Sequence, residues 1–216
     1  MPPLLLGSSS ARRRALIAAV GLSFEVARPE VDESPLPAEP PDAYVLRLCR
    51  AKAMALPPER LIPETYILTA DTTVVLDGVI IGKPDTPQEA RAMLRALRGR
   101  AHQVYTGVAL RDFATGEVQT SLTVTTVHMR SYSDTEIEAY IARGEPFDKA
   151  GGYAVQDSLF KPVERIEGCL TNVIGLPLCA LSAMLRAKGI HAPQPPSCSP
   201  DNLPCTFDAA LADGAR

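Results

Sequence analysis

One stretch in the first half of the chain constrains the fold most, because its pattern requires two paired strands. Residues 66–70 form an apolar, β-branched run, and residues 72–76 continue it. Asp77-Gly78 follows, a dipeptide typical of two-residue hairpin turns, and residues 79–81 are again apolar. The sequence therefore predicts a long buried strand that turns back on itself as an antiparallel hairpin.

Strand and helix signals alternate along the rest of the chain. Apolar runs predict further strands at residues 4–6, 102–110 and 121–130, the last two joined by a turn at 114–117. Helical spacing predicts helices at residues 12–20, 43–55, 87–97 and 134–141, and then a strand-like piece and a helix within 173–185. This order, with its hairpins, favours an α/β fold with a mixed rather than purely parallel sheet.

Two of these helices carry start signals. Thr86 is predicted as an N-cap, with Glu89 completing a capping box, and Gly99 as the stop of that helix. Ser133 and Glu136 have the same spacing and predict a second capping box.

Length and composition limit the class of protein. The 216 residues suffice for one sizeable core. We predict one domain over residues 1–192 and, because proline is dense beyond it, a poorly ordered extension over 193–216. No apolar run approaches the ~20 residues of a membrane span, and the start lacks a signal-peptide pattern, so we expect a cytoplasmic protein that binds no membrane.

Charge and cysteine usage exclude further classes. The 22 basic and 25 acidic residues give a net charge of −3, which argues against a general nucleic-acid-binding protein. Five cysteines without a C-x-x-C pair, and only three histidines, argue against a Cys/His zinc site. Cys49, Cys169 and Cys179 are expected to fill the core as thiols, whereas Cys198 and Cys205 in the extension could pair or stay free.

The first segment suited to chemistry is residues 6–13, Leu-Gly-Ser-Ser-Ser-Ala-Arg-Arg, between a predicted strand and a predicted helix. Small residues there expose backbone N–H groups and a helix N-terminus, and the hydroxyls and arginines add donors for phosphate oxygens. The segment is either a phosphate site or the solvated basic start of a helix.

The second is a carboxylate inside the buried strand, Asp71. Aspartate is disfavoured in strand interiors and costly to bury without a partner, which favours a role as a general base or metal ligand over a structural one. The hairpin folds Lys83, which follows the return strand, toward Asp71. The Gly-Lys pair there lacks P-loop spacing, so Lys83 alone reads as a surface residue.

The third is residues 144–156, which combine Asp148, Lys149, a glycine pair and Gln156. Paired glycines let the backbone approach a ligand, and a glutamine amide can bond a base edge bidentately. An irregular surface loop explains the pattern at least as well.

Together these segments resemble the Maf family of nucleoside triphosphate pyrophosphatases. Four blocks in the family's order carry the resemblance: residues 6–13, residues 70–72 with 82–84, residues 102–108, and residues 148–156. Gly175-Leu176-Pro177 also resembles the family's closing strand-to-helix turn. Ala11 departs from the family's usual proline and Gly7 from its usual alanine, and both changes are conservative for an anion-binding turn.

The resemblance implies an elongated mixed β-sheet flanked by helices with a central cleft, as in inosine-triphosphate pyrophosphatases, and a homodimer with a divalent cation, Mg²⁺ or Mn²⁺. It implies hydrolysis of a nucleoside triphosphate between the α and β phosphates. Asp71 would accept the proton of water, and Glu33 and Asp71 would hold the metal. The phosphates would be bound by Ser8, Arg12, Arg13, Lys52 and Lys83.

Thr72 and Gln156 resemble the pattern of family members that act on dTTP and UTP, and would bind substrate. A sister group acting on methylated guanine nucleotides differs at these positions. The expected substrates are therefore dTTP and UTP or modified pyrimidine nucleotides. Two alternatives stay open: a pyrophosphatase for methylated guanine nucleotides, and a nucleotide-binding regulator of cell division with incidental hydrolysis.

Lysine is scarce, with five lysines among the 22 basic residues. Lys52, Lys83 and Lys149 fall in or beside the segments above, whereas Lys161 and Lys188 do not. Where arginine would serve, this chain uses arginine, so these three lysines predict contacts that need a compact ammonium group.

Overall fold

The computed structural model describes residues 3–56 and 61–191. Seven strands lie in this part: β1 (Leu4–Gly7), β2 (Glu25–Ala27), β3 (Tyr66–Leu76), β4 (Val79–Ile81), β5 (Ala101–Asp112), β6 (Val118–Met129) and β7 (Val163–Glu167). They form one sheet in the order β2-β1-β3-β5-β6-β7, with β4 paired to β3. β1 is parallel to β2 and β3, and the other pairs are antiparallel, which confirms the predicted mixed sheet and hairpin.

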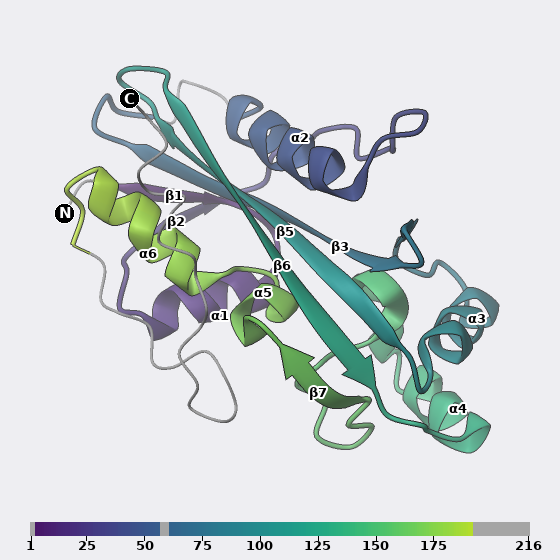
Figure 1. Ribbon diagram of the computed structural model, residues 1–216. Coiled ribbons are helices and arrows are strands. Elements are labelled where there is room, and N and C mark those ends of the chain that lie inside the picture. Colours follow the sequence, from purple (N-terminus) through teal and green to yellow (C-terminus); the bar gives the residue numbers. More distant parts are fainter. Residues whose placement is uncertain (1–2, 57–60, 192–216) are drawn as a thin grey trace.

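Helices flank this sheet. The described residues form α1 (Ala11–Ala19), α2 (Pro41–Met54), α3 (Pro87–Leu97), α4 (Asp134–Ala142), α5 (Leu170–Ile174) and α6 (Leu178–Ala187). In Figure 1, α2 covers one face of the sheet, α1, α5 and α6 lie on the other, and α3 and α4 lie at the far end of the long strands. Two short 3₁₀ turns, η2 (Glu145–Asp148) and η3 (Ala150–Gly152), follow α4.

Side chains of β3 contribute to three apolar clusters, two on one face of the strand and one on the other. One contains Leu68 with side chains of α1 and α6, and a second contains Val74 with side chains of α3 and α4. Thr72 lies between them on the same face, because successive residues of a strand alternate between faces, and it is paired with Thr106 of β5. Ile67, on the opposite face, packs with α2 in the third cluster. The polar interruption of β3 therefore separates two apolar clusters.

Helix α2 approaches β5 very closely at Gly107. A Cβ atom at this position would lie 2.6 Å from the carbonyl oxygen of Val45 in α2. Gly107 is also the register partner of Asp71. The absence of a side chain at Gly107 thus sets how near α2 lies to the strand that carries Asp71.

We expect Gly107→Ala to destabilise the protein by about 1–3 kcal/mol, because α2 must shift to admit the methyl group. Urea denaturation followed by circular dichroism measures this. Gly82→Ala is the matched control, since a Cβ there has nothing within 4 Å. Equal unfolding midpoints in the two variants would contradict the close packing of α2.

Near the C-terminal end the sequence pattern is misleading in two places. Residues 163–167 form the edge strand β7, which was not predicted because Glu164, Arg165 and Glu167 mask its alternation. Charged residues are common on edge strands, where one side of the backbone stays unpaired.

The predicted strand-like piece beginning at Val173 is wrong, because residues 170–174 form helix α5. Asn172 is fully buried, and its Nδ2 donates to the carbonyl of Val104 at 3.0 Å and to Oγ1 of Thr125 at 2.9 Å. These tertiary bonds hold a helical turn in a β-branched segment. The turn at Gly175 consequently joins two helices instead of a strand and a helix.

The helix caps largely follow the prediction. Ser133 and Glu136 form the expected capping box of α4. Thr86 caps α3, with its Oγ1 accepting from the backbone N–H of Glu89 at 3.2 Å. The other half of that box is wrong, because the Glu89 carboxylate accepts from the N–H of Asp85 at 2.8 Å.

Three remaining expectations concern thiols, the chain end and membranes. Cys49 and Cys169 are buried as predicted, and Cys179 is half-buried. Cys198, Cys205 and the predicted extension 193–216 lie outside the described residues. None of the described helices has the length and apolar character needed to cross a membrane.

Candidate active site

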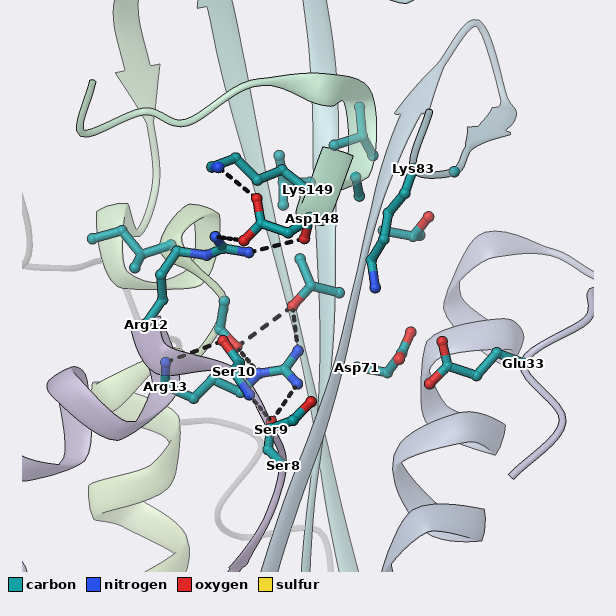
Figure 2. Close-up of a pocket in the computed structure, with 18 of the residues that line it drawn as sticks. Ser8, Ser9, Ser10, Arg12, Arg13, Glu33, Asp71, Lys83, Asp148 and Lys149 are labelled. Atoms are coloured by element: carbon teal, nitrogen blue, oxygen red, sulfur yellow. Dashed lines mark hydrogen bonds and ion pairs between the residues drawn. The ribbon is translucent and has the colours of Figure 1, made fainter. Parts of the chain in front are cut away.

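A cavity of about 960 Å³ opens where the polar part of β3 meets the loops around it. In Figure 2 the serines and arginines at the start of α1 lie on one side of the β3 strand, and Asp71, Glu33 and Lys83 on the other. All the residues predicted as site residues line this cavity: Ser8, Arg12, Arg13, Glu33, Lys52, Asp71, Thr72, Lys83 and Gln156. The fold thus brings together positions up to about 150 residues apart in sequence.

A lysine joins two carboxylates on the α2 side of the cavity. Lys52 Nζ lies 2.6 Å from Oδ1 of Asp71 and 2.7 Å from Oε1 of Glu33. The side chains of Lys52 and Asp71 are each 10% exposed, whereas that of Glu33 is 51% exposed. Thr69 ties α2 to β3 beside them, donating from Oγ1 to the carbonyl of Cys49 at 2.6 Å.

The pKa values of the two carboxyl groups are shifted in opposite directions. Burial raises the pKa of Asp71, and this outweighs the opposing attraction of Lys52. For Glu33, burial acts in the same direction, but the hydrogen bond and charge of Lys52 prevail and lower its pKa. A pair of carboxyl groups with divergent pKa values is the arrangement that separates a proton acceptor from a permanently charged partner. Asp71 suits the first role and Glu33 the second.

Arg13 is fixed in place by three hydrogen bonds. It donates from Nε to the carbonyl of Gly175 at 2.8 Å, from Nη1 to Oγ of Ser8 at 3.2 Å and from Nη2 to Oγ1 of Thr72 at 3.2 Å. Burial lowers the pKa of Arg13 and the charge of Asp71 opposes this, but a guanidinium stays protonated in proteins. Since a guanidinium has five N–H donors, two remain for an anion.

Serine hydroxyls surround the start of α1. Ser10 is the N-cap of α1, and its Oγ accepts from the backbone N–H of Arg13 at 3.4 Å. The N–H of Ser10 donates to Oγ of Ser8 at 3.2 Å. The predicted strand–turn–helix is therefore present, with its hydroxyls organised around the helix start.

Arg12 reaches across the cavity to Asp148 and Lys149, which belong to the predicted segment 144–156 but had been given no binding role. Its Nη1 donates to Oδ2 of Asp148 at 2.7 Å, and Lys149 Nζ contacts the other oxygen of that carboxylate at 2.5 Å. The side chain of Asp148 is 65% exposed, so these ion pairs are worth little in water and can exchange for a charged ligand. The signal for Asp148 and Lys149 was the acid, base and glycine pattern of residues 144–156.

Arg28 and Glu30 were also missed, and both line the cavity from the loop after β2. This loop has no periodic pattern, so its sequence gave no signal. With them, six arginines and lysines face four carboxylates in the cavity lining: Arg12, Arg13, Arg28, Lys52, Lys83 and Lys149 against Glu30, Glu33, Asp71 and Asp148. The excess of positive charge favours a polyanionic ligand.

The donor set also fits a magnesium or manganese ion of a particular kind. Among the described residues there is no group of three or more His, Cys, Asp or Glu side chains that could hold a metal by itself. Glu33 and Asp71 converge on one point, however, since each lies within 2.7 Å of the same ammonium group. Mg²⁺ is commonly bound by one or two carboxylates together with substrate phosphates and water. The residues present fit that mode.

Thr72 and Gln156, the two residues predicted to contact the substrate base, also line the cavity. Thr72 Oγ1 is 2.8 Å from Oγ1 of Thr106, which in turn donates to the carbonyl of Asn172 at 3.2 Å. Gln156 is exposed on the loop after η3. Thr72 is thus held rigidly, whereas the Gln156 amide is open to a ligand.

Fold and site define a class: an α/β protein with a cationic cavity built for a phosphorylated ligand beside a buried acid–lysine pair. The chain belongs to the Maf family, since the family model described as "Maf-like protein" matches residues 3–188. This confirms the resemblance carried by the four sequence blocks.

Curated relatives from three bacteria are each named dTTP/UTP pyrophosphatase. That of Anaeromyxobacter dehalogenans (strain 2CP-C) is 44% identical over 194 residues, 89% of this chain and 97% of the relative. Those of Chromobacterium violaceum and Thermomicrobium roseum are 46% and 47% identical, covering 88% and 89% of this chain and 96% and 87% of the relatives.

Solved structures match with much lower sequence identity. The nucleoside-triphosphatase / dITP/XTP pyrophosphatase of Mycobacterium abscessus is 16% identical with a TM-score of 0.41, covering 86% of this chain and 97% of that chain. A likeness at this level carries no functional argument.

Proposed function

We propose that this protein hydrolyses dTTP and UTP, or modified pyrimidine nucleotides, to the monophosphate and pyrophosphate. The observation that carries the proposal is the buried contact of Lys52 with Asp71 and Glu33 at a cationic cavity. The substrate class is supported by the relatives named dTTP/UTP pyrophosphatase, to which this chain is 44–47% identical.

In this proposal Asp71 is the proton acceptor. Its raised pKa makes it a better base than an exposed aspartate, and the ammonium of Lys52 opposes part of that rise. Water attacks the α phosphorus while its proton passes to Asp71, the bond from that phosphorus to the oxygen bridging the β phosphate breaks, and pyrophosphate leaves. Positioning and charge stabilisation supply most of the rate enhancement in phosphoryl transfer.

The triphosphate is bound by the cations and hydroxyls of the cavity. Arg13 offers its two remaining N–H groups, and Ser8 and the start of α1 add donors. Arg12 exchanges its exposed partner Asp148 for phosphate oxygens. Lys83, at the end of β4, and Lys52 complete the set.

A divalent cation, Mg²⁺ or Mn²⁺, would be held by Glu33 and Asp71. When bound with the nucleotide, it supplies charge neutralisation to the phosphates. Glu33 suits this role because its lowered pKa keeps it ionised.

For the nucleobase of the substrate, Gln156 and Thr72 favour a pyrimidine. The exposed Gln156 amide can donate to and accept from one base edge at the same time. Thr72 lines the cavity beside Arg13, to which it is hydrogen-bonded. We also propose the homodimer implied by the family resemblance, the cytoplasmic location expected from the composition, and a catalytic domain ending near residue 192.

The test is pyrophosphate release over a panel of nucleoside triphosphates with Mg²⁺ or Mn²⁺. We expect dTTP and UTP to turn over fastest, by about tenfold in kcat/KM or more over ATP, GTP and CTP, because Gln156 reads the base edge. Much faster turnover of 7-methyl-GTP would contradict the pyrimidine assignment. Tight nucleotide binding without any turnover would contradict the enzyme and favour a nucleotide-binding regulator.

A further inference from the structure

A buried histidine that the proposed mechanism does not use contacts a residue of the cavity wall. His102 of β5 is 3% exposed, and its Nε2 lies 2.7 Å from the hydroxyl of Tyr153. The two rings meet edge to face, with centroids 5.3 Å apart. His102 Nδ1 is buried and has no hydrogen-bond partner among the described residues, so Tyr153 is the one polar contact recorded for this ring there.

His102 itself does not line the cavity, but Tyr153 does. Burial, together with the charge of His128, lowers the pKa of His102 to about 4, so the imidazole is neutral at neutral pH. Because His102 does not line the cavity, its ring has no direct access to the substrate. The geometry instead fits a fixed support for the loop that carries Tyr153.

The backbone before Tyr153 is fastened to the β3–β4 hairpin. The N–H of Gly151 donates to the carbonyl of Gly82 at 2.9 Å, next to Lys83. Gly151 has φ +72°, and a Cβ there would come within 3.1 Å of Val74. Only glycine allows this backbone to lie so close to β3.

The backbone after Tyr153 forms the turn that carries Gln156. The N–H of Ala154 donates to the hydroxyl of Tyr140 at 3.1 Å, and the N–H of Asp157 closes the turn by donating to the carbonyl of Ala154 at 3.2 Å. Arg143 holds the far end by donating from Nη2 to both oxygens of the Asp157 carboxylate, at 2.9 and 3.0 Å. Gln156 is therefore presented between two anchored points.

We infer that His102 is a positioning residue for substrate selection, acting through the Tyr153 hydroxyl to hold the turn that presents Gln156 to the nucleobase. The inference rests on the proposed function, because it needs a pyrimidine nucleotide as substrate. Loss of the His102 contact should therefore change base recognition and substrate binding. The contacts of Asp71, Lys52 and Glu33 lie on the other face of β3.

The experiment compares steady-state kinetics with UTP and CTP in Tyr153→Phe, His102→Leu and the double variant. Each single variant should raise KM for UTP about fivefold and reduce the preference for UTP over CTP, with kcat within about twofold, as expected for one lost hydrogen bond. The double variant should be no worse than either single one, because both remove the same bond. His102→Gln, whose amide can reach the same hydroxyl, should restore KM to within about twofold of wild type.

Tyr132→Phe is the matched control. Tyr132 is a buried tyrosine of the same apolar cluster, and its hydroxyl donates to the carbonyl of Leu94 at 2.7 Å, in α3 rather than in the loop. It should lower the melting temperature comparably but leave KM and base preference unchanged. An equal rise in KM in Tyr132→Phe would overturn the inference, as would unchanged KM in Tyr153→Phe and His102→Leu. Absence of pyrimidine turnover in the wild-type enzyme would instead overturn the proposed function.

Discussion

Asp71→Asn should lower kcat for dTTP and UTP by about 100-fold or more while the protein still folds and binds nucleotide. Removing a general base typically costs on the order of 10²–10⁴-fold. The amide has the size of the carboxylate, and its oxygen can still accept a hydrogen bond from Lys52, which lies 2.6 Å from Asp71 in the native enzyme. Pyrophosphate release measures the loss, and isothermal titration calorimetry with UTP measures the retained binding.

Asp77→Asn is the matched control for this variant. Asp77 follows the same strand, β3, and its exposed carboxylate is paired with Arg100 at 2.8 Å, outside the cavity lining. Asn tolerates the positive φ of 52° at this position. We expect wild-type kcat. Near-wild-type activity in Asp71→Asn itself would remove Asp71 from the mechanism.

The parts of the site set by local rules could be predicted from the sequence. The Asp77-Gly78 turn fixes the hairpin register, with Val74 opposite Ile81, and the chain that follows brings Lys83 into the same cavity lining as Asp71. Strand alternation has a period of two, so a polar residue in a buried run can be placed on a face without tertiary information.

Contacts between distant segments could not be predicted in this way. The meeting of Lys52 and Glu33 at Asp71 depends on how closely α2 packs on β5 at Gly107, which no local pattern encodes. The bond of Arg13 to the carbonyl of Gly175 joins residues 162 positions apart. The family resemblance assigned roles to these residues, but it did not describe their contacts.

The adjacent residues Asp71 and Thr72 explain why the cavity has two distinct sides. They point to opposite faces of β3, so Asp71 meets Lys52 of α2 while Thr72 meets Arg13 of α1. The proposed proton acceptor and the fixed Arg13 guanidinium thus lie on different faces of one strand. The polar interruption in β3 that first marked Asp71 as functional also opens the gap between two apolar clusters.

The three lysines singled out by the scarcity of lysine lie where the sequence predicted them. Lys52, Lys83 and Lys149 all line the cavity. Lys188 lies elsewhere, in an exposed pair with Glu117 at 2.7 Å. Of the three, Lys52 has the most demanding surroundings, because two carboxylate oxygens lie within 2.7 Å of its nitrogen.

Lys52→Met should lower kcat/KM by about 100-fold or more at neutral pH, and it should also change the pH dependence. Loss of one preorganised electrostatic contact at a reacting group costs on the order of 10²–10³-fold. Because Lys52 counteracts the rise in the pKa of Asp71, its removal should raise that pKa further. Asp71 must be ionised to accept a proton, so the acid limb of kcat/KM should move to higher pH. A pH series of pyrophosphate release measures both effects.

Two further variants separate the charge of Lys52 from its shape. Lys188→Met removes a lysine outside the cavity and should leave both rate and acid limb unchanged. Lys52→Arg keeps the positive charge, so the acid limb should stay near its wild-type position. The rate should still fall at least about tenfold, because a planar guanidinium cannot replace an ammonium held between two carboxylates at 2.6 and 2.7 Å. Full activity in Lys52→Arg would show that charge alone is required there, and a wild-type acid limb in Lys52→Met would show that Lys52 does not control the protonation of Asp71.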